Sequence, residues 1–444
     1  MIKTPIHSFL EEYKASHSVR LHMPGHKGVG DGAEKMDITE ISGADSLFEA
    51  NGIIEESERI AGEIFGADTF YSTEGSSLSI RAMLYLAALY AKKLGKAPLI
   101  AAARNVHKSF VSAAALVDFG IDWISSEQSS YLSAMITADD VQAYFNSAGE
   151  LPAALYLTSP DYLGYVSDIK KIADVCHKNG VLLIVDNAHG AYLKFLKPSS
   201  HPIDLGADLC CDSAHKTLSA LTGCAYMHIS KSAPPFFKEN AKRAMMLFAS
   251  SSPSYLMLDS LDRLNPYLKQ DFSSDLQIFI DKIKLLKNKL SQLGFTFADN
   301  EPMKIAIRTK DFGYLGTDIS DYLLKSGIVS EFADSDYLVL MPSPQNTDEE
   351  LRRLFVALSS LKRKENISSL PPAAHLPKKK ISIREAIMTD FEILPVCQCN
   401  GRVASSVTLG CPPAIPIAAP GEIIDEEIIL AFEYYGIYEC AVVK

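Results

Sequence analysis

Cysteine is scarce in this chain, and long apolar runs and an excess of positive charge are absent. Eight cysteines in 444 residues are too few for a disulfide scaffold, and the adjacent Cys210 and Cys211 lie in an apolar run that suits reduced, buried thiols. The longest apolar stretch, 83–91, is half of the roughly 18 residues that a membrane span needs. The first seventeen residues contain two glutamates and a proline and no apolar stretch of signal-peptide length. We therefore expect a cytoplasmic protein without a membrane span.

Acidic residues outnumber basic ones. The chain has 43 Lys and Arg against 54 Asp and Glu, a net charge of −11. This balance argues against a general nucleic-acid binder and is compatible with small cationic substrates. Apolar residues make up 47% and charged residues 22% of the chain, which excludes a mostly disordered protein. The length predicts two or three domains.

Apolar runs alternate with helical patterns through the first 230 residues. The strand-like runs are 98–104, 154–159, 181–187, 207–213 and 224–229, and the helical patterns are 57–65, 79–94, 109–117 and 168–179. Continuous apolar strands separated by helices predict an α/β fold, with a large, mainly parallel sheet covered on both faces.

The later part of the chain changes character. Strand-like runs at 304–309 and 337–343, between helical patterns, predict a smaller α+β domain. A Pro-, Ser- and Lys-rich stretch then reads as a linker, and a proline-rich apolar segment follows it. We expect an N-terminal arm at 1–30, a large domain at 31–262, a small α+β domain at 263–365, a linker at 366–380 and a C-terminal α+β domain at 381–444.

Two polar residues stand where apolar strands end. Asp186 ends VLLIVD, and Lys216 follows ADLCCDSAH thirty residues later. Ligands of open parallel sheets bind outside the carboxyl ends of the strands. An amine and a carboxylate facing one crevice suit pyridoxal phosphate, which needs an amine for its Schiff base and a carboxylate to keep its pyridine nitrogen protonated. Taken singly, each residue is more often a helix cap, a salt-bridge partner or a solvated side chain.

The sequence also contains a candidate phosphate-binding segment, or phosphate cup. In TEGSSLS (73–79), Gly75, Ser76 and Ser77 precede a helical pattern, and hydroxyl groups at a helix start can bind phosphate. The alternative is an ordinary N-cap. Together with Asp186 and Lys216, the cup favours the cofactor.

At this point the sequence resembles the prokaryotic ornithine/lysine/arginine decarboxylases, which are pyridoxal-phosphate enzymes of the aspartate-aminotransferase fold, or fold type I. The chain looks like their short form. The similar stretches keep the order of the family and span nearly the whole chain. They are LHMPGHKG, GADSLFEANGII, RNVHKS, TSPDYLGYVSDI, VDNAHGAY, GADLCCDSAHKTLSALTG, SSPSYLMLDSLD and CPPAIPIAAPGE.

The resemblance implies roles for named residues. Lys216 would form the Schiff base with the cofactor, Asp186 would pair with the pyridinium nitrogen, and His107 would stack on one face of the ring. These three would be the catalytic residues. The other cofactor-binding residues would be Gly75, Ser76, Ser77, Ala188, His189, Ser213, His215 and Ser252. Ser250 or Ser252 would reach the phosphate of the partner subunit, which implies a homodimer.

The sequence departs from the family pattern in several places. The phosphate cup of the family usually reads Asn-Gly-Ser-Thr followed by Ser-Gly-Asn, whereas this chain has EGSSLSI at 74–80. Glu74 stands beside the phosphate cup, where a carboxylate is unfavourable unless it points away. Asn187 replaces the usual acidic residue after the nitrogen-pairing aspartate. In the C-terminal segment, Cys411 and Ala414 replace the usual tyrosine and glycine.

The resemblance implies decarboxylation of ornithine, lysine or arginine to an amine and CO2. An aminotransferase or aldolase reaction, or a non-catalytic protein of the same fold, remains an alternative. We expect no metal, because Pro24 lies between His22 and His26 and prevents a shared helical face. Glu422 is expected either to be a helix-entry or solvent residue, or to help form an acidic pocket wall for a cationic substrate.

Overall fold

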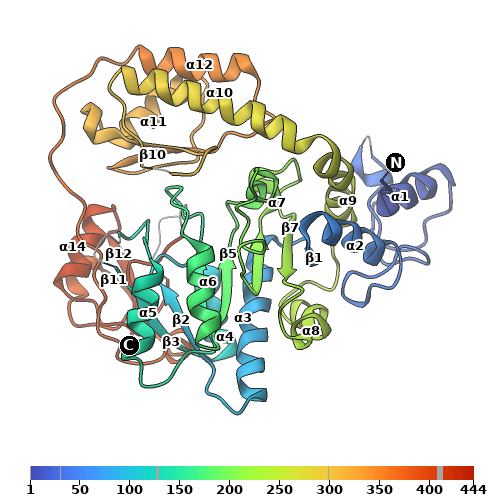
Figure 1. Ribbon diagram of the computed structural model, residues 1–444, viewed down its shortest axis with the longest axis horizontal. Coiled ribbons are helices and arrows are strands. Elements are labelled where there is room, and N and C mark those ends of the chain that lie inside the picture. Colours follow the sequence, from blue (N-terminus) through green and yellow to red (C-terminus); the bar gives the residue numbers. More distant parts are fainter. Residues whose placement is uncertain (1, 31, 127–129, 299, 408–413) are drawn as a thin grey trace. The chain divides into compact units, whose positions relative to one another are not determined.

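The computed structural model describes residues 2–30, 32–126, 130–298, 300–407 and 414–444 (Figure 1). Cys411 therefore lies outside the described residues. The chain forms two compact units by its tertiary contacts. The first unit comprises Met1–Pro98, Ala153–Leu155 and Ile169–Leu276, and the second comprises Leu99–Pro152, Tyr156–Asp168 and Gln277–Lys444. The domain limits expected from the sequence stay predictions.

The large sheet has seven strands in the order β1-β7-β6-β5-β4-β2-β3. Its strands are β1 (Asp68–Ser72), β2 (Leu99–Ala103), β3 (Gly120–Ile124), β4 (Ala154–Thr158), β5 (Leu182–Asp186), β6 (Leu209–Asp212) and β7 (Ala225–Ile229). β5 pairs with β6 and β2 pairs with β3 in parallel, whereas β7 is antiparallel to both β1 and β6. This arrangement confirms the predicted α/β fold with a mainly parallel sheet.

Most of the predicted helices and strands form within a few residues of the expected limits. The helices are α1 (Pro5–Ala15), α2 (Ile53–Phe65), α3 (Gly75–Lys93), α4 (Lys108–Val117), α5 (Ala138–Ser147), α6 (Ile169–Lys178), α7 (Ala214–Thr217), α8 (Pro235–Met246), α9 (Tyr255–Gln270), α10 (Phe272–Gln292), α11 (Gly316–Lys325), α12 (Asp348–Ser359), α13 (Ile383–Met388) and α14 (Glu426–Tyr434). The apolar runs form fully buried strands, as in β7, because both faces of such a sheet are covered.

Some elements were not predicted from the sequence pattern. β1 and β3 mix polar and apolar residues (DTFYS and GIDWI), so they lack a continuous apolar run. α9 contains Pro266 in its interior, a residue that normally ends a helical pattern. Tertiary packing decides these elements, and none of their residues belongs to the predicted site.

The second unit contains two small sheets. β8 (Ile305–Arg308), β10 (Tyr337–Leu340) and β9 (Phe332–Ala333) form an antiparallel sheet in the order β8-β10-β9. Figure 1 shows α10 and α12 side by side over this sheet. β11 (Phe391–Pro395) and β12 (Glu439–Val443) form an antiparallel pair. These two α+β arrangements confirm the expected small and C-terminal domains in architecture.

The proline-rich segment is buried where the structure describes it. Ile417 and Ala418 belong to a core cluster that also contains residues of α14 and β12. Among the helices of the described ranges, none is both long enough and apolar enough to cross a bilayer.

Candidate active site

The candidate site begins where two neighbouring parallel strands end. Asp186 is the last residue of β5 and pairs with Cys211 of β6. β6 ends at Asp212, and the short helix α7 places Lys216 just beyond it. Because β5 and β6 are parallel, the carboxylate and the amine follow the same edge of the sheet, as the sequence predicts.

Local hydrogen bonds orient the Asp186 carboxylate. Asp186 is buried, with 2% of its surface exposed. Its Oδ1 accepts a hydrogen bond from the backbone N–H of Ala188 at 3.1 Å and one from Cys211 Sγ at 3.6 Å. Burial and the nearby Asp186 charge raise the pKa of Cys211 well above its usual value, so the thiol stays protonated and donates. One oxygen of Asp186 is thereby fixed inside the protein.

Lys216 and its neighbour His215 on α7 contact different partners. Lys216 Nζ lies 2.9 Å from His189 Nε2, and His189 is almost fully buried. His215 Nδ1 lies 3.0 Å from the carbonyl oxygen of Cys224, so this nitrogen carries the proton and donates. The structure therefore brings Lys216 and His189 together and turns one edge of the His215 ring towards β7.

The Gly-Ser-Ser segment forms the start of α3. Gly75 has φ +71°, a conformation that favours glycine, and its N–H donates to the Gly223 carbonyl at 2.7 Å. Ser213 Oγ donates to Ser76 Oγ at 3.0 Å, which joins the residue after β6 to the first turn of α3. Ser77 follows in the same turn. Hydroxyl groups at the N-terminus of a 19-residue helix provide donors and a positive dipole end for a phosphate.

Glu74 has a structural partner. It is exposed, and its Oε1 accepts a hydrogen bond from the backbone N–H of Ser250 at 2.6 Å. Ser250 Oγ in turn accepts from the N–H of Ser252 at 3.2 Å. The unusual carboxylate thus holds the exposed 250–252 segment, so its presence does not argue against the phosphate cup.

His107 lies in the second compact unit. It is the N-cap of α4, where its Nδ1 accepts from the Ser109 N–H at 3.2 Å and lies 2.8 Å from Ser109 Oγ. The ring is therefore held through Nδ1. The predicted stacking of His107 and Ala188 on opposite faces of a cofactor ring stays a prediction.

A buried histidine–aspartate network underlies the site, and sequence reasoning missed it. Asp212, His201 and His228 are all fully buried. Asp212 Oδ2 lies 3.0 Å from His201 Nε2 and 3.1 Å from His228 Nε2. His201 Nδ1 accepts from the Ile203 N–H at 3.4 Å, so its Nε2 donates. The residues are separated by 11 and 16 positions along the chain, and no local spacing could have revealed the cluster.

The network explains one departure from the family pattern. Asn187 Nδ2 donates to Asp212 Oδ1 at 2.6 Å. A carboxylate at position 187 would face the Asp212 carboxylate, which is costly in a buried site. An amide donor at position 187 suits an aspartate at position 212. The network thus links the residue after Asp186 to the residue before Ser213.

Asp212 should also make the fold sensitive to acid. Burial opposes its ionisation, but the attraction and hydrogen bonds of His201 and His228 outweigh this and hold the pKa of Asp212 well below its usual value. Burial lowers the pKa of His228, and its Nε2 lies 3.1 Å from Asp212 Oδ2. The pKa of an aspartate in the unfolded chain is about 3.9. Because the pKa of Asp212 is lower than this in the folded protein, its ionised form stabilises the fold at a pH above about 3.9. This stabilisation is lost progressively as the pH falls below that value.

We expect Asp212→Asn to lower the free energy of unfolding at pH 7 by about 3 kcal/mol, because a buried charged acceptor of four hydrogen bonds is lost. The difference from the wild type should shrink as the pH falls below about 4. Urea unfolding at several pH values measures both effects. Asp204→Asn is the control, because Asp204 pairs with Lys194 near the surface and such pairs contribute little. A pH-independent gap would contradict the assignment.

The same cluster contains groups that could bind a metal. His201, Cys210 and Asp212 place ligand atoms within 4.8 Å of one another. However, the two imidazoles direct their Nε2–H groups at Asp212, and burial raises the pKa of Cys210 well above its usual value. This favours a hydrogen-bonded network. His22 and His26 also bind different partners, Tyr13 and Asp37.

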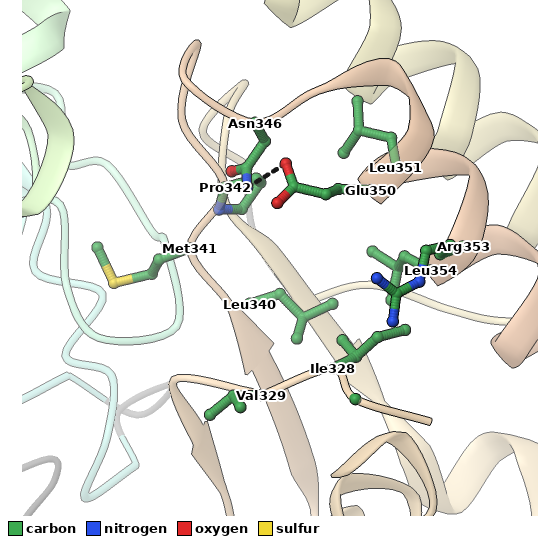
Figure 2. Close-up of a pocket in the computed structure, with 11 residues that line it drawn as sticks. Ile328, Val329, Leu340, Met341, Pro342, Asn346, Glu350, Leu351, Arg353 and Leu354 are labelled. Atoms are coloured by element: carbon green, nitrogen blue, oxygen red, sulfur yellow. Dashed lines mark hydrogen bonds between the residues drawn. The ribbon is translucent and has the colours of Figure 1, made fainter. Parts of the chain in front are cut away.

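A surface pocket of about 240 Å³ lies in the second unit between β10 and α12 (Figure 2). Its charged residues are occupied by structural contacts. Glu350 forms the capping box of α12 with Thr347, and Arg353 Nη2 donates to the Ser326 carbonyl at 3.1 Å. Asn346 Nδ2 donates to Glu350 at 3.4 Å. The pocket therefore offers no uncommitted charged group for catalysis.

The residues of the first unit fit pyridoxal phosphate. The cofactor needs an amine, a carboxylate and a phosphate cup. Lys216, the oriented Asp186 and the joined hydroxyls of Ser76 and Ser213 are the candidates for these three groups, at the ends of adjacent strands and the start of α3. The fold and these residues define a protein of the pyridoxal-phosphate fold type I class.

Comparison with known families identifies the group within this class. The family model "Orn/Lys/Arg decarboxylase, major domain" matches residues 4–296, and "Orn/Lys/Arg decarboxylase, C-terminal domain" matches residues 362–440. The chain belongs to the Orn/Lys/Arg decarboxylase family, as the sequence motifs indicate.

Curated relatives match along most of their length. The arginine decarboxylase of Halalkalibacterium halodurans is 28% identical, covering 96% of this chain and 91% of the relative. The arginine decarboxylase of Bacillus subtilis is 26% identical, covering 96% and 92%.

Solved structures agree on the fold. The constitutive lysine decarboxylase of E. coli superposes with a TM-score of 0.79 at 18% identity, covering 100% of this chain and 82% of that one. Lysine decarboxylase A from Pseudomonas aeruginosa gives a TM-score of 0.81 at 17% identity, covering 99% and 80%.

Proposed function

We propose that this chain is a pyridoxal-phosphate-dependent decarboxylase of a basic amino acid, with arginine as the first substrate to test. The observation that carries the proposal is the placement of Asp186 and Lys216 after adjacent parallel strands, beside the Ser76–Ser213 hydroxyl pair. Membership of the Orn/Lys/Arg decarboxylase family supports the reaction. The names of the curated relatives support arginine.

Each residue has a defined task in this proposal. When bound, pyridoxal phosphate supplies an electron sink for the pair left on the α-carbon as CO2 departs. Lys216 holds the cofactor through its amine, with His189 orienting that amine. Asp186 keeps the pyridine nitrogen protonated, because its buried carboxylate is fixed by Ala188 and Cys211. His107 or Lys216 then returns a proton to the α-carbon.

The remaining residues bind and shield the cofactor. Ser76 and Ser77 at the start of α3, together with Ser213, bind the phosphate, with Gly75 in the same turn and His215 beside it. Ala188 and His107 flank the ring. These contacts would position the cofactor.

Product analysis tests the proposal. The purified protein, loaded with pyridoxal phosphate, is incubated separately with arginine, lysine and ornithine, and CO2 and the amine are measured. We expect equal amounts of CO2 and amine from one of them. A keto acid without CO2 would indicate an aminotransferase, and no product from any substrate would indicate a non-catalytic protein.

We also propose a homodimer whose sites are completed across the interface by Ser250 or Ser252. We expect mixing of inactive Lys216→Ala with inactive Ser250→Ala/Ser252→Ala to restore about a quarter of wild-type activity, because half of randomly formed dimers contain one intact site of two. Sedimentation velocity and activity after mixing measure this. A fully active monomer, or no restoration in mixed dimers, would refute it.

A cytoplasmic location is the further part of the proposal. The seven described cysteines are free thiols, and six of them are buried, which suits a reducing compartment.

A further inference from the structure

The loop that carries His107 forms hydrogen bonds, before and after this residue, with the C-terminal segment 414–422 of the same compact unit. The loop runs from the end of β2 at Ala103 to the start of α4 at Lys108. Before His107, Arg104 Nη2 donates to the Ile417 carbonyl at 3.0 Å. After His107, the Lys108 N–H donates to the Ala414 carbonyl at 2.9 Å.

A buried ion pair reinforces the first of these contacts, the one that Arg104 makes. Arg104 Nη2 also donates to Glu422 Oε2 at 2.8 Å, and each of the two side chains is only 4% exposed. The guanidinium lies over the ring of Trp123, with 4.8 Å from its central carbon to the ring centroid. Glu422 Oε2 accepts a second hydrogen bond from the Ala419 N–H at 2.6 Å. The two charges therefore balance each other away from water.

The guanidinium depends on few contacts. Among the described residues, Nε and Nη1 of Arg104 have no hydrogen-bond partner, so Nη2 alone makes both bonds to the C-terminal segment. When only one nitrogen of a buried guanidinium makes hydrogen bonds, the charge is held chiefly by the carboxylate that pairs with it. Changing Glu422 should therefore release Arg104 and, with it, the loop that precedes His107.

This contact changes the interpretation of Glu422. The sequence suggested a helix-entry or solvent residue, or an acidic wall for a cationic substrate. The carboxylate is buried and its charge is balanced by Arg104. We therefore expect Glu422 to affect a reaction by setting the position of His107 rather than by attracting a cationic substrate.

We propose that the Arg104–Glu422 pair is a positioning device that sets the place of His107, so that the C-terminal domain acts on the reaction through His107. The inference rests on the proposed function, which assigns His107 to the cofactor ring. Displacing a catalytic group by about 1 Å costs on the order of a hundredfold in rate, so a released loop should lower kcat.

The first experiment compares Glu422→Gln with Glu426→Gln. Glu426 is exposed at the start of α14, and its substitution removes the same charge from the same domain. The imidazole carbon signal of His107 is followed in protein labelled with 13C-histidine and is assigned with His107→Gln. We expect Glu422→Gln to shift this signal and to lower kcat about tenfold or more, with KM and cofactor affinity within twofold. Glu426→Gln should change none of these.

A double-mutant cycle separates positioning from a direct role. If Glu422 acts through His107, adding Glu422→Gln to His107→Gln should lower kcat by less than a further twofold. If the two effects multiply, Glu422 acts independently and the proposal is overturned.

Loss of one buried charge can unfold a protein, so a charge-balanced variant is included. Arg104→Gln/Glu422→Gln removes both charges and is expected to keep the unfolding temperature while still shifting the His107 signal. An unchanged His107 signal in this folded variant overturns the proposal. The signal is read without substrate. A shifted signal in a protein that releases no CO2 from any basic amino acid therefore supports the positioning device and refutes the proposed function alone.

Discussion

Lys216→Ala should abolish the covalent bond between the protein and pyridoxal phosphate that borohydride reduction makes permanent. It should also lower turnover at least about a thousandfold. The amine that holds the cofactor and can move a proton is removed, and loss of such a group costs several orders of magnitude. Reduction of the wild type followed by peptide mapping should place the pyridoxyl label on Lys216. Turnover is measured as CO2 release.

Lys231→Ala is the matched control. Lys231 is an exposed lysine just beyond β7 in the same compact unit, and its loss should leave label and turnover unchanged. A label on another lysine in the wild type, or turnover of Lys216→Ala near the wild-type rate, would show that the amine has been assigned to the wrong residue.

Asp186→Asn should lower turnover by about a hundred- to a thousandfold while changing cofactor affinity much less. An amide cannot keep the pyridine nitrogen protonated, so a charge that stabilises the transition state is lost. Lys216 and the Ser76–Ser213 hydroxyl pair remain to hold the cofactor. The dissociation constant of pyridoxal phosphate and kcat, measured on the same preparation, separate the two effects.

Asp174→Asn serves as its control, because Asp174 is an exposed residue paired with Lys170 on α6. Its turnover should equal that of the wild type. Survival of Asp186→Asn turnover within a few-fold of the wild type would remove Asp186 from the catalytic set.

The sequence alone could indicate the candidate site because its residues are tied to local features. Asp186 ends an apolar strand, Lys216 follows the next one, and Gly75 opens a helix. An apolar run shows where a buried strand ends, and parallel strands end on one edge of the sheet. The resemblance to a family then assigned roles to residues that have no such local signal, among them His107 and His189.

Only the tertiary structure shows which residues that are distant in sequence contact one another. His201 and His228 reach Asp212 from separate segments, and Arg104 meets Glu422 across 318 positions. Local periodicity describes which face of an element is buried, but it carries no information about which distant side chain lies opposite. The departure at Asn187 likewise became intelligible only when its amide was found to donate to Asp212.

The sequence by itself thus determined the α/β class and the family, and it predicted the positions of the amine, the carboxylate and the phosphate cup. Each of these depends on strand ends, helix starts or short motifs, which are contiguous in the chain. The tertiary structure decided how these groups are supported: the Asp212 network beneath the first unit's site, the partner of Glu74, and the Arg104–Glu422 pair beside His107. Buried polar groups must find partners wherever folding brings them, and only the folded chain shows which partners those are.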